Sequence, residues 1–369
     1  MTQPRILLDA PNSGDLEKEY VMRALDSGYV STAGPLVNEF EERFRSYIGA
    51  PYAVATVNGT SAIHLALRLL GIGPGDEVVV PALTFISTVN PVVYMGATPV
   101  VVDVDPRTWN IKVDEFENAI TGRTRAVIPV HLYGNPADME GVVRVAQRYG
   151  LHVIEDAAEA LGAVLNGAHV GTFGIIGVFS FNGNKVITTG GGGMLVTKDP
   201  DIAGRARLLV NQGRAAGVVE YKHQEIGYNY RLTNLQAALG LAQLERLQEF
   251  LAAKRRNAAL YRELLQGKPG LEWQYELKGA ESSWWLFSVL IDPEKFGEDR
   301  GAVAQRFEAS GIQVRPLFMP VTHQPPYREY RFQPCPVAES LYARGLNLPS
   351  ASFLGEKEVR ETCRVLLSG

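Results

Sequence analysis

Residues 52–81 read YAVATVNGTSAIHLALRLLGIGPGDEVVVP and determine the expected fold. The apolar runs 53–57 and 77–81 have the length and composition of short buried strands. Between them, polar capping residues lead into a helical pattern that ends at Gly71, and glycine commonly follows a helix. A strand, a helix and a second strand in this order predict a βαβ unit whose strands are parallel.

The same alternation of apolar runs, turns and helical patterns continues to residue 197. We therefore expect an α/β fold with a large domain built on a mainly parallel seven-stranded sheet. The expected strands are residues 53–57, 77–81, 98–103, 126–131, 152–155, 176–181 and 193–197.

A capping box at residues 233–236 begins a helical pattern that extends to Leu265, which predicts one long helix. Its basic run Lys254-Arg255-Arg256 is expected on a solvated face. Since long helices commonly bridge domains, we expect a large domain, residues 1–245, whose N-terminal residues can pack on the second domain, and a smaller C-terminal α+β domain, residues 246–369. The smaller domain should contain strand 284–291, helix 302–309 and strand 312–317.

The composition restricts the functional class. The chain has 369 residues, 46% of them hydrophobic, and a net charge of -4 with 36 basic and 40 acidic residues scattered among one another. This distribution has no basic stripe for nucleic acid. Residues 1–14 lack the apolar core of a signal peptide and no stretch predicts a membrane span, so we expect a cytoplasmic protein. The two cysteines, Cys335 and Cys363, predict neither a disulfide framework nor a metal site.

Three features near predicted strand ends suit pyridoxal 5'-phosphate (PLP). Lys185 lies in the turn FSFNGNK, residues 179–185, just ahead of four glycines, and Asp156 ends a predicted strand. The loop Asn58-Gly59-Thr60 precedes a helix, whose N-terminus favours a phosphate. PLP requires an amine for an imine, a carboxylate beside its pyridine nitrogen and a polar cup for its phosphate. Because the carboxyl ends of parallel strands share one sheet edge, these residues should meet there.

Other side chains are candidates for the same site. We expect the Ser180 hydroxyl to bind the phosphate, Phe85 to stack on the ring and Glu159 to approach the ring hydroxyl or the substrate. Each residue alone also has an ordinary interpretation: a helix cap for Asp156, a solvated turn lysine for Lys185, a core aromatic for Phe85 and a surface carboxylate for Glu159. Their order on successive elements is what favours the cofactor.

Nearly the whole chain resembles the DegT/DnrJ/StrS family of aminotransferases, which have the fold-type I PLP-dependent transferase fold and act on nucleotide-linked keto sugars. The resemblance is carried by STAGPLV (31–37), Phe40-Glu41, Asn58-Gly59-Thr60, GPGDEV (73–78), PVHLYG (129–134), EDAAEA (155–160), FSF (179–181), Lys185 and GYNYRLT (227–233).

The resemblance implies a role for each matching residue. Lys185 forms the imine and later moves protons, Asp156 pairs with the pyridinium, and Gly59, Thr60 and Ser180 hold the phosphate. Asn229 completes the phosphate site of a neighbouring subunit, which implies a homodimer with shared active sites. Arg231, Arg315 and His323 are implied candidates for the substrate region.

Glu159 stands where Gln is commoner in the family. Together with NGNKVITT, residues 182–189, it resembles the C4 aminotransferases of the perosamine and bacillosamine pathways. We therefore expect L-glutamate as donor and a GDP- or UDP-linked 4-keto-6-deoxy sugar as acceptor. Two departures affect the sugar contacts: Gly191 replaces a usual Glu, and His323 lies one position later than in similar chains.

Several alternatives stay open at this point. A PLP-dependent sugar dehydratase of the same fold carries His where this chain has Lys185, and amination at C3 is an alternative to C4. A nicotinamide-dependent sugar dehydrogenase requires a Gly-x-Gly-x-x-Gly turn after the first strand, which this sequence lacks. A non-catalytic regulator with the same fold is opposed by the intact set Lys185, Asp156 and Ser180.

Overall fold

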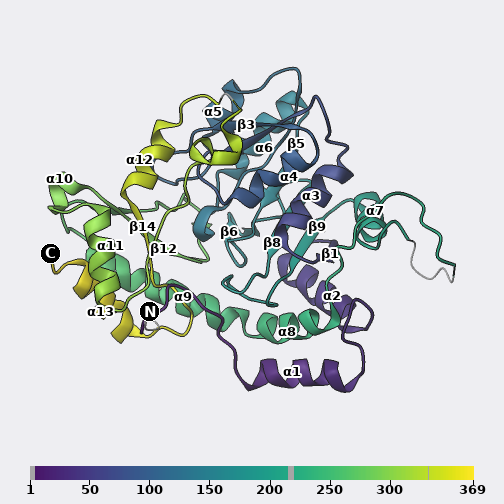
Figure 1. Ribbon diagram of the computed structural model, residues 1–369, viewed down its shortest axis with the longest axis horizontal. Helices are drawn as coiled ribbons and strands as arrows, with labels where there is room; N and C mark the ends of the chain where they lie inside the picture. The colour runs from purple at the N-terminus through teal and green to yellow at the C-terminus, as the bar shows by residue number, and fades with distance from the viewer. Residues whose placement is uncertain (1–4, 215–219, 331) are drawn as a thin grey trace.

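The computed structural model describes residues 5–214, 220–330 and 332–369 (Figure 1). Its main sheet has seven strands in the order β1-β9-β8-β5-β4-β2-β3, which confirms the predicted large sheet. Strand β9 is antiparallel to both neighbours and the other pairs are parallel. The strands are β1 (Tyr52–Thr56), β2 (Glu77–Pro81), β3 (Thr98–Val102), β4 (Thr124–Val127), β5 (His152–Asp156), β8 (Ile176–Ser180) and β9 (Gly193–Thr197).

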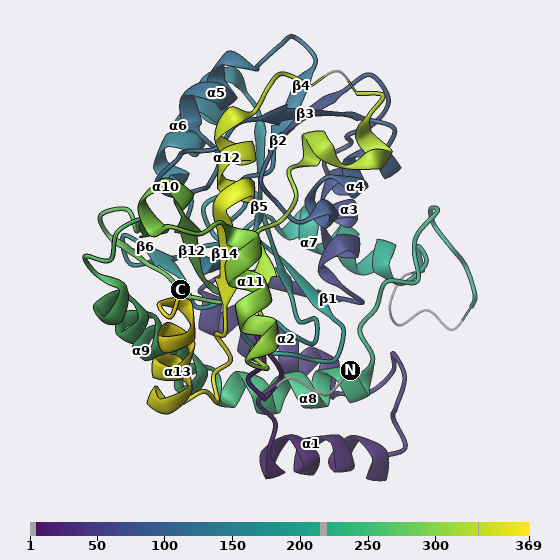
Figure 2. The same cartoon turned by 60° about the vertical axis from the view of Figure 1, so that its left-hand side comes forward.

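Helices pack around this sheet (Figures 1 and 2). Helix α3 is nearly all buried, because it lies against β8 and β9 and is also flanked by α4 and α7. Asn58 caps it by accepting a hydrogen bond from the Ser61 amide, as the sequence predicts. The helices of this region are α1 (Asp15–Asp26), α2 (Leu36–Ile48), α3 (Gly59–Leu69), α4 (Asn90–Tyr94), α5 (Val113–Asn118), α6 (Met139–Tyr149), α7 (Pro200–Val210) and α8 (Asn234–Glu245).

The C-terminal part forms the smaller α+β unit (Figure 2). Its antiparallel sheet has the order β10-β12-β14-β13. Tyr261, Phe287 and Phe307 lie in a separate apolar core beside it. The N-terminal Ile6 pairs with Ile312, so the start of the described chain packs on this unit. Its elements are β10 (Leu271–Trp273), β12 (Phe287–Ile291), β13 (Arg315–Pro316), β14 (Gly345–Leu348), α9 (Leu247–Leu265), α10 (Pro293–Phe296), α11 (Arg300–Ala309), α12 (Pro336–Arg344) and α13 (Glu356–Leu366). A third, small sheet joins β6 (Val164–Leu165), β7 (Ala168–His169) and β11 (Ala280–Glu281).

The prediction of one helix from residue 233 to 265 is wrong. The capping box at Thr233 is confirmed, but α8 and α9 meet at Arg246, whose φ of -93° and ψ of 0° interrupt the helix. The two helices follow different partners, since α8 packs on α1 and α2 whereas α9 packs on α13. The domain boundary at 245/246 stays a prediction.

Two further expectations also need correction. Lys254 is not on a solvated face: it is buried, and its Nζ lies 3.1 Å from Oδ2 of Asp9. The strand expected from residue 284 begins only at Phe287, because Trp284 has a left-handed φ of 50° that no regular strand accommodates. The strand expected over 312–317 is reduced to Arg315–Pro316.

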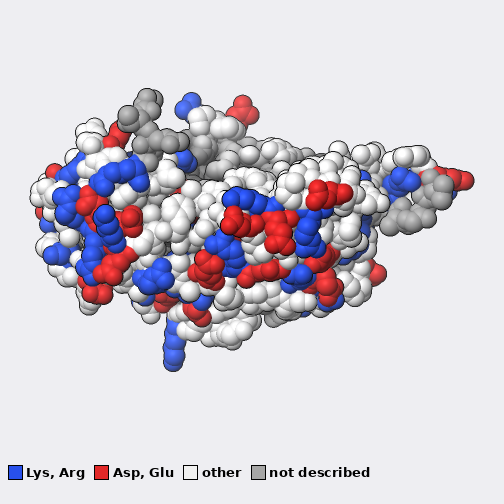
Figure 3. All heavy atoms as spheres, turned by 90° about the horizontal axis from the view of Figure 1, so that it is seen from below, with Lys and Arg blue, Asp and Glu red and all other residues white. Residues whose placement is uncertain are grey.

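Among the described residues, no helix is long and apolar enough to cross a membrane. The face seen from below in Figure 3 carries acidic and basic side chains side by side. The described part of the chain has ion pairs on its surface, such as those of Arg43 with Glu39 and Glu245.

Candidate active site

The ends of three strands bring the predicted cofactor residues to one sheet edge. Asp156 ends β5, Ser180 ends β8, and Gly59 opens α3 after β1. The chain turns after Ser180, and the Lys185 amide donates to the Asn182 carbonyl, 3.0 Å away. The structure therefore places a lysine-bearing turn beside a helix N-terminus and a buried carboxylate.

The Asp156 carboxylate is buried and held by two donors. The Thr88 hydroxyl donates to Oδ2 over 2.7 Å, and the Ala158 amide donates to Oδ1 over 3.1 Å. Burial raises the pKa of Asp156, while these hydrogen bonds and the charge of Lys185 oppose that rise. A buried carboxylate is stabilised by a cationic partner, and a protonated pyridine nitrogen is such a partner.

Glu159 lies in a turn, three residues after Asp156. The turn directs it to the site, because its Oε1 lies 3.6 Å from Lys185 Nζ. Its Oε2 accepts from the Tyr133 amide, 2.9 Å away. Burial raises the pKa of Glu159, and the charge of Lys185 opposes that rise.

The hydroxyls that are expected to bind the phosphate lie around the N-terminus of α3. A Cβ added to Gly59 would lie 3.0 Å from Ser180 Cβ, so these two residues touch. The Thr60 hydroxyl donates to Ser87 Oγ over 2.9 Å. The first amides of a helix have no partner within it and carry partial positive charge, which suits a phosphate.

This set of donors fits PLP. An amine, a buried carboxylate and a hydroxyl-lined helix terminus occur together at one edge of the sheet. Phe85 is 51% exposed and its ring centroid lies 5.4 Å from that of Phe318, at the loop that also supplies Thr88. An exposed ring there has a free face on which a planar cofactor can stack.

The structure does not bring every predicted residue to Lys185. Asn229 is exposed on the loop that projects from the body in Figure 1 and pairs with Asn211 through a backbone bridge. Arg231 is half-buried; burial lowers its pKa, as does the charge of Arg214. No hydrogen-bond partner is found for its Nε in the described part of the chain. Arg315 is exposed in β13. The roles of these residues stay predictions.

His323 likewise has a partner outside the Lys185 cluster. Its Nε2 lies 3.2 Å from Oε1 of Glu339, and both side chains are half exposed. Its substrate role also stays a prediction.

The sequence analysis missed two residues of the site. Trp285 places its ring centroid 3.7 Å from Lys185 Nζ, and Thr88 binds Asp156. Trp285 comes from the C-terminal part, 100 positions after Lys185 in the sequence, so no local pattern connects the two. For Thr88, the available signal was a threonine shortly after the end of a predicted strand.

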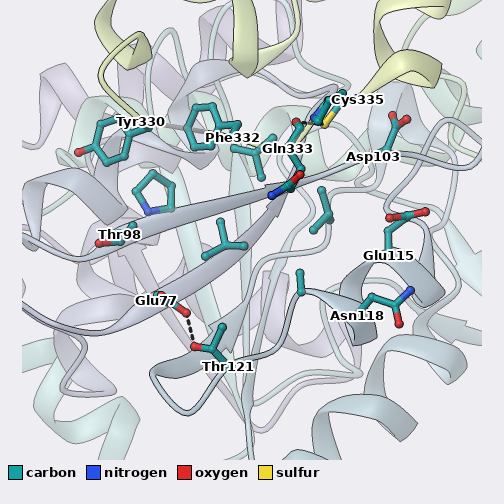
Figure 4. A pocket seen from close by; sticks show the side chains of 16 residues that line it. Glu77, Thr98, Asp103, Glu115, Asn118, Thr121, Tyr330, Phe332, Gln333 and Cys335 are labelled. Atoms are coloured by element: carbon teal, nitrogen blue, oxygen red, sulfur yellow. Dashed lines mark hydrogen bonds between the residues drawn. The ribbon is translucent and has the colours of Figure 1, made fainter.

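A cavity of about 510 Å³ lies elsewhere, beside edge strand β3 (Figure 4). Glu77, Asp103 and Cys335 are among the residues that line it, and none of the predicted site residues does. It is therefore separate from the Lys185 cluster.

Fold and site together define an α/β enzyme that uses PLP. The chain belongs to the DegT/DnrJ/EryC1/StrS aminotransferase family, whose sequence model matches residues 11–367. It is 44% identical over 358 residues to the GDP-perosamine synthase of Caulobacter vibrioides, covering 96% of each chain.

Solved structures agree with this assignment. The aminotransferase TlmJ from Streptoalloteichus hindustanus is similar with a TM-score of 0.93 and 31% identity, covering 98% of each chain. The PLP form of Spr1654 from Streptococcus pneumoniae, described as a sugar aminotransferase, has a TM-score of 0.93 and 27% identity, covering 98% of this chain and 97% of that one. Enzymes of this family use PLP.

Proposed function

We propose that this aminotransferase moves the amino group of L-glutamate to C4 of a GDP- or UDP-linked 4-keto-6-deoxy sugar. The observation that carries the proposal is Lys185, whose Nζ lies 3.6 Å from Glu159 at the strand edge that also holds Asp156. The similarity to a GDP-perosamine synthase supports a nucleotide-linked sugar as the acceptor.

Three side chains of the protein have separate roles in the proposed reaction. PLP, when bound, would supply an electron-accepting ring. Asp156 presents a buried carboxylate to the ring nitrogen and holds positive charge there. The Lys185 amine takes a proton at Nζ from the alpha carbon of the donor and delivers it within the site. Glu159 lies close enough to that amine to hold it in place by charge.

The overall reaction balances in two halves. Glutamate would be converted into 2-oxoglutarate in the first half, which takes up one water, and the keto sugar would gain the amino group in the second half, which releases one water from its keto oxygen. Lys185 moves a proton in each direction, so the same amine serves both halves. A histidine at this position cannot form the covalent link, which is why the retained lysine opposes the dehydratase alternative.

The homodimer is part of the same proposal. Asn229 lies on an exposed loop that also carries Ile226, which is 86% exposed. Tyr221 on the same loop is 84% exposed, and two large exposed apolar side chains on one loop are typical of a surface that a partner covers. We infer that Asn229 enters the phosphate site of a second copy of this chain.

The decisive experiment offers glutamate and a panel of GDP-, UDP- and dTDP-linked 4-keto-6-deoxy sugars to the PLP-loaded protein. The mass of the sugar product should be the one expected when an amine replaces the keto oxygen of the substrate. NMR should place that amine at C4. Amination of a 3-keto sugar but of none of the 4-keto sugars would support the C3 alternative, and loss of water without an amine would support the dehydratase alternative. Borohydride reduction and peptide mapping provide an independent test, since the cofactor should be found on Lys185.

A further inference from the structure

The amine of Lys185 lies on the face of an indole ring. Its Nζ is 3.7 Å from the centroid of the Trp285 ring and 3.6 Å from Oε1 of Glu159. The two sides of this contact come from distant parts of the chain: Lys185 from the turn after β8, and Trp285 from the segment that leads into β12. Both side chains are largely buried.

The indole ring is fixed to the lysine turn itself. Trp285 Nε1 donates to the carbonyl of Asn184, the residue directly before Lys185, over 2.5 Å. The ring also packs on Tyr133, with 6.2 Å between the ring centroids. A ring held at its polar end and along its apolar body presents the same face to the amine.

The backbone that carries Trp285 is also constrained. A Cβ added to Gly134 would lie 2.8 Å from the Trp285 amide nitrogen, so the two chain segments are in close contact. The Ser283 amide donates to the Gly134 carbonyl over 3.1 Å, and the Leu286 amide donates to the Tyr133 carbonyl over 3.3 Å. The segment on either side of Trp285 is thus tied to the loop after β4.

A second cation supports the same segment from behind. Lys254 Nζ donates to the Trp285 carbonyl over 3.2 Å and to the Ser350 carbonyl over 2.7 Å, and lies 3.1 Å from Asp9. Each of the three N–H groups of the Lys254 amine can therefore bind one of these oxygens, and one of them is the Trp285 carbonyl. The ring face is left to Lys185, and the negative face of an indole attracts an ammonium group.

We propose that Trp285 is a positioning residue that holds the Lys185 amine whenever this amine is not bonded to the cofactor. The proposal rests on the proposed function in assigning the proton transfers to Lys185. A lysine released from the cofactor has four rotatable bonds and can turn away from the reacting carbon. The indole face and the Glu159 carboxylate keep the amine where it must act, so that the lysine does not have to be reoriented in each half-reaction.

The test compares two substitutions. Trp285→Phe keeps an aromatic face but loses the N–H donated to Asn184 and one of the two fused rings, whereas Trp285→Leu removes the face. In the protein without cofactor, competitive acetylation followed by peptide mapping reports how firmly the Lys185 amine is held, with the exposed Lys278 as internal reference. We expect acetylation of Lys185 about three- to tenfold faster in Trp285→Leu and within twofold of wild type in Trp285→Phe.

Steady-state kinetics of the loaded enzyme give a second readout. We expect Trp285→Leu to lower kcat about fivefold with KM for glutamate within twofold, since the amine is used after the donor binds. Trp273→Leu is the matched control, because Trp273 packs in the separate C-terminal core: it should lower stability and leave both readouts unchanged. Should Trp285→Leu fold poorly, Trp285→Met supplies a second aliphatic side chain.

Wild-type acetylation rates in both the Leu and Met variants, or an equal loss of kcat in the Phe variant, would overturn the proposal. Neither result affects the proposed function, which is tested separately by borohydride labelling at Lys185 and by the sugar panel. If borohydride fails to label Lys185 but the acetylation rates are as expected, the contact between Trp285 and Lys185 stands and the proposed reaction does not.

Discussion

Thr88 donates its hydroxyl hydrogen to Oδ2 of Asp156 over 2.7 Å, and both residues are buried. The bond joins the loop after β2 to the end of β5, two strands that are separated by β4 in the sheet, so residues from two strand ends fix one carboxylate. With the Ala158 amide on the other oxygen, each Asp156 oxygen has a donor. The carboxylate therefore has a defined orientation toward the position proposed for the cofactor's ring nitrogen.

Replacing Thr88 with Val should weaken cofactor binding. The substitution keeps the shape of the side chain and removes one donor to a charged group, and such bonds contribute about 1.5–3 kcal/mol. We expect the dissociation constant for PLP to rise about tenfold or more. Titration of the protein with PLP, followed by absorbance, measures this change.

Thr84→Val is the graded control for that experiment. The Thr84 hydroxyl lies 2.8 Å from that of Thr88 and does not touch Asp156. We expect a smaller loss of affinity than in Thr88→Val. Equal losses in both variants would indicate that the loop as a whole, and not the bond to Asp156, controls binding.

Gly59→Ala should impair phosphate binding without unfolding the protein. The new Cβ would lie 3.0 Å from Ser180 Cβ, so the serine must move by a few tenths of an ångström away from the α3 terminus. We expect weaker PLP binding, with a smaller change for pyridoxal, which has no phosphate. Gly204→Ala is the control, since nothing lies within 4 Å of its Cβ, and it should be neutral or stabilising. A parallel loss for PLP and pyridoxal would contradict the assignment of this cup to phosphate.

Asp9 should make stability depend on pH in the acid range. Burial raises its pKa from 3.8 to about 6, against the opposing charges of Lys254 and Lys185. The folded state therefore binds this proton more tightly than the unfolded chain. The resulting stabilisation is present below about pH 4 and is lost as the pH rises through about 6, a change of up to about 3 kcal/mol.

Asp9→Asn removes this titration and isolates its effect. Denaturant unfolding of both proteins without cofactor, from pH 4.5 to 7.5, gives the free energies of unfolding. The wild-type value minus the Asn value should fall as the pH rises to about 6 and then level off. A difference that is constant over the whole range would show that Asp9 does not titrate there.

Local patterns sufficed for the large sheet because each strand is a short apolar run between polar turns. Local patterns did not predict the break at Arg246, because the residues on both sides favour a helix and no stop signal lies between them. The break coincides with a tertiary contact, since the Arg246 guanidinium lies 3.1 Å from Oε1 of Glu17 on α1. Such contacts lie outside any window of the sequence.

The residues of the candidate site also divide into those that local patterns predict and those that they do not. Lys185, Asp156 and Ser180 follow strand ends and so were predictable from topology. Lys254 was misinterpreted because a basic run on a helix is usually solvated, and its partner Asp9 lies far away in the sequence. Trp285 was read as part of a strand, although its ring faces Lys185. Only the folded chain brings these residues together.

Mixing two inactive variants should restore activity if active sites are shared between subunits. Lys185→Ala removes the reactive amine, and Asn229→Ala removes the side chain proposed to enter the partner's site. A mixed dimer then has one site with both defects and one site with neither. We expect recovery toward about one quarter of wild-type turnover in an equal mixture that has exchanged subunits, because half of the dimers are mixed and each has one intact site.

The two parent proteins, measured alone at the same total concentration, are the controls. If Asn229 acts within its own subunit, every site of the mixed dimer keeps one defect and turnover does not exceed the average of the parents. Measuring the molecular mass of the mixed proteins in solution also shows whether the protein is a monomer, which cannot exchange subunits. Recovery above the parents therefore requires both that two copies associate and that Asn229 reaches across, because neither condition alone assembles an intact site.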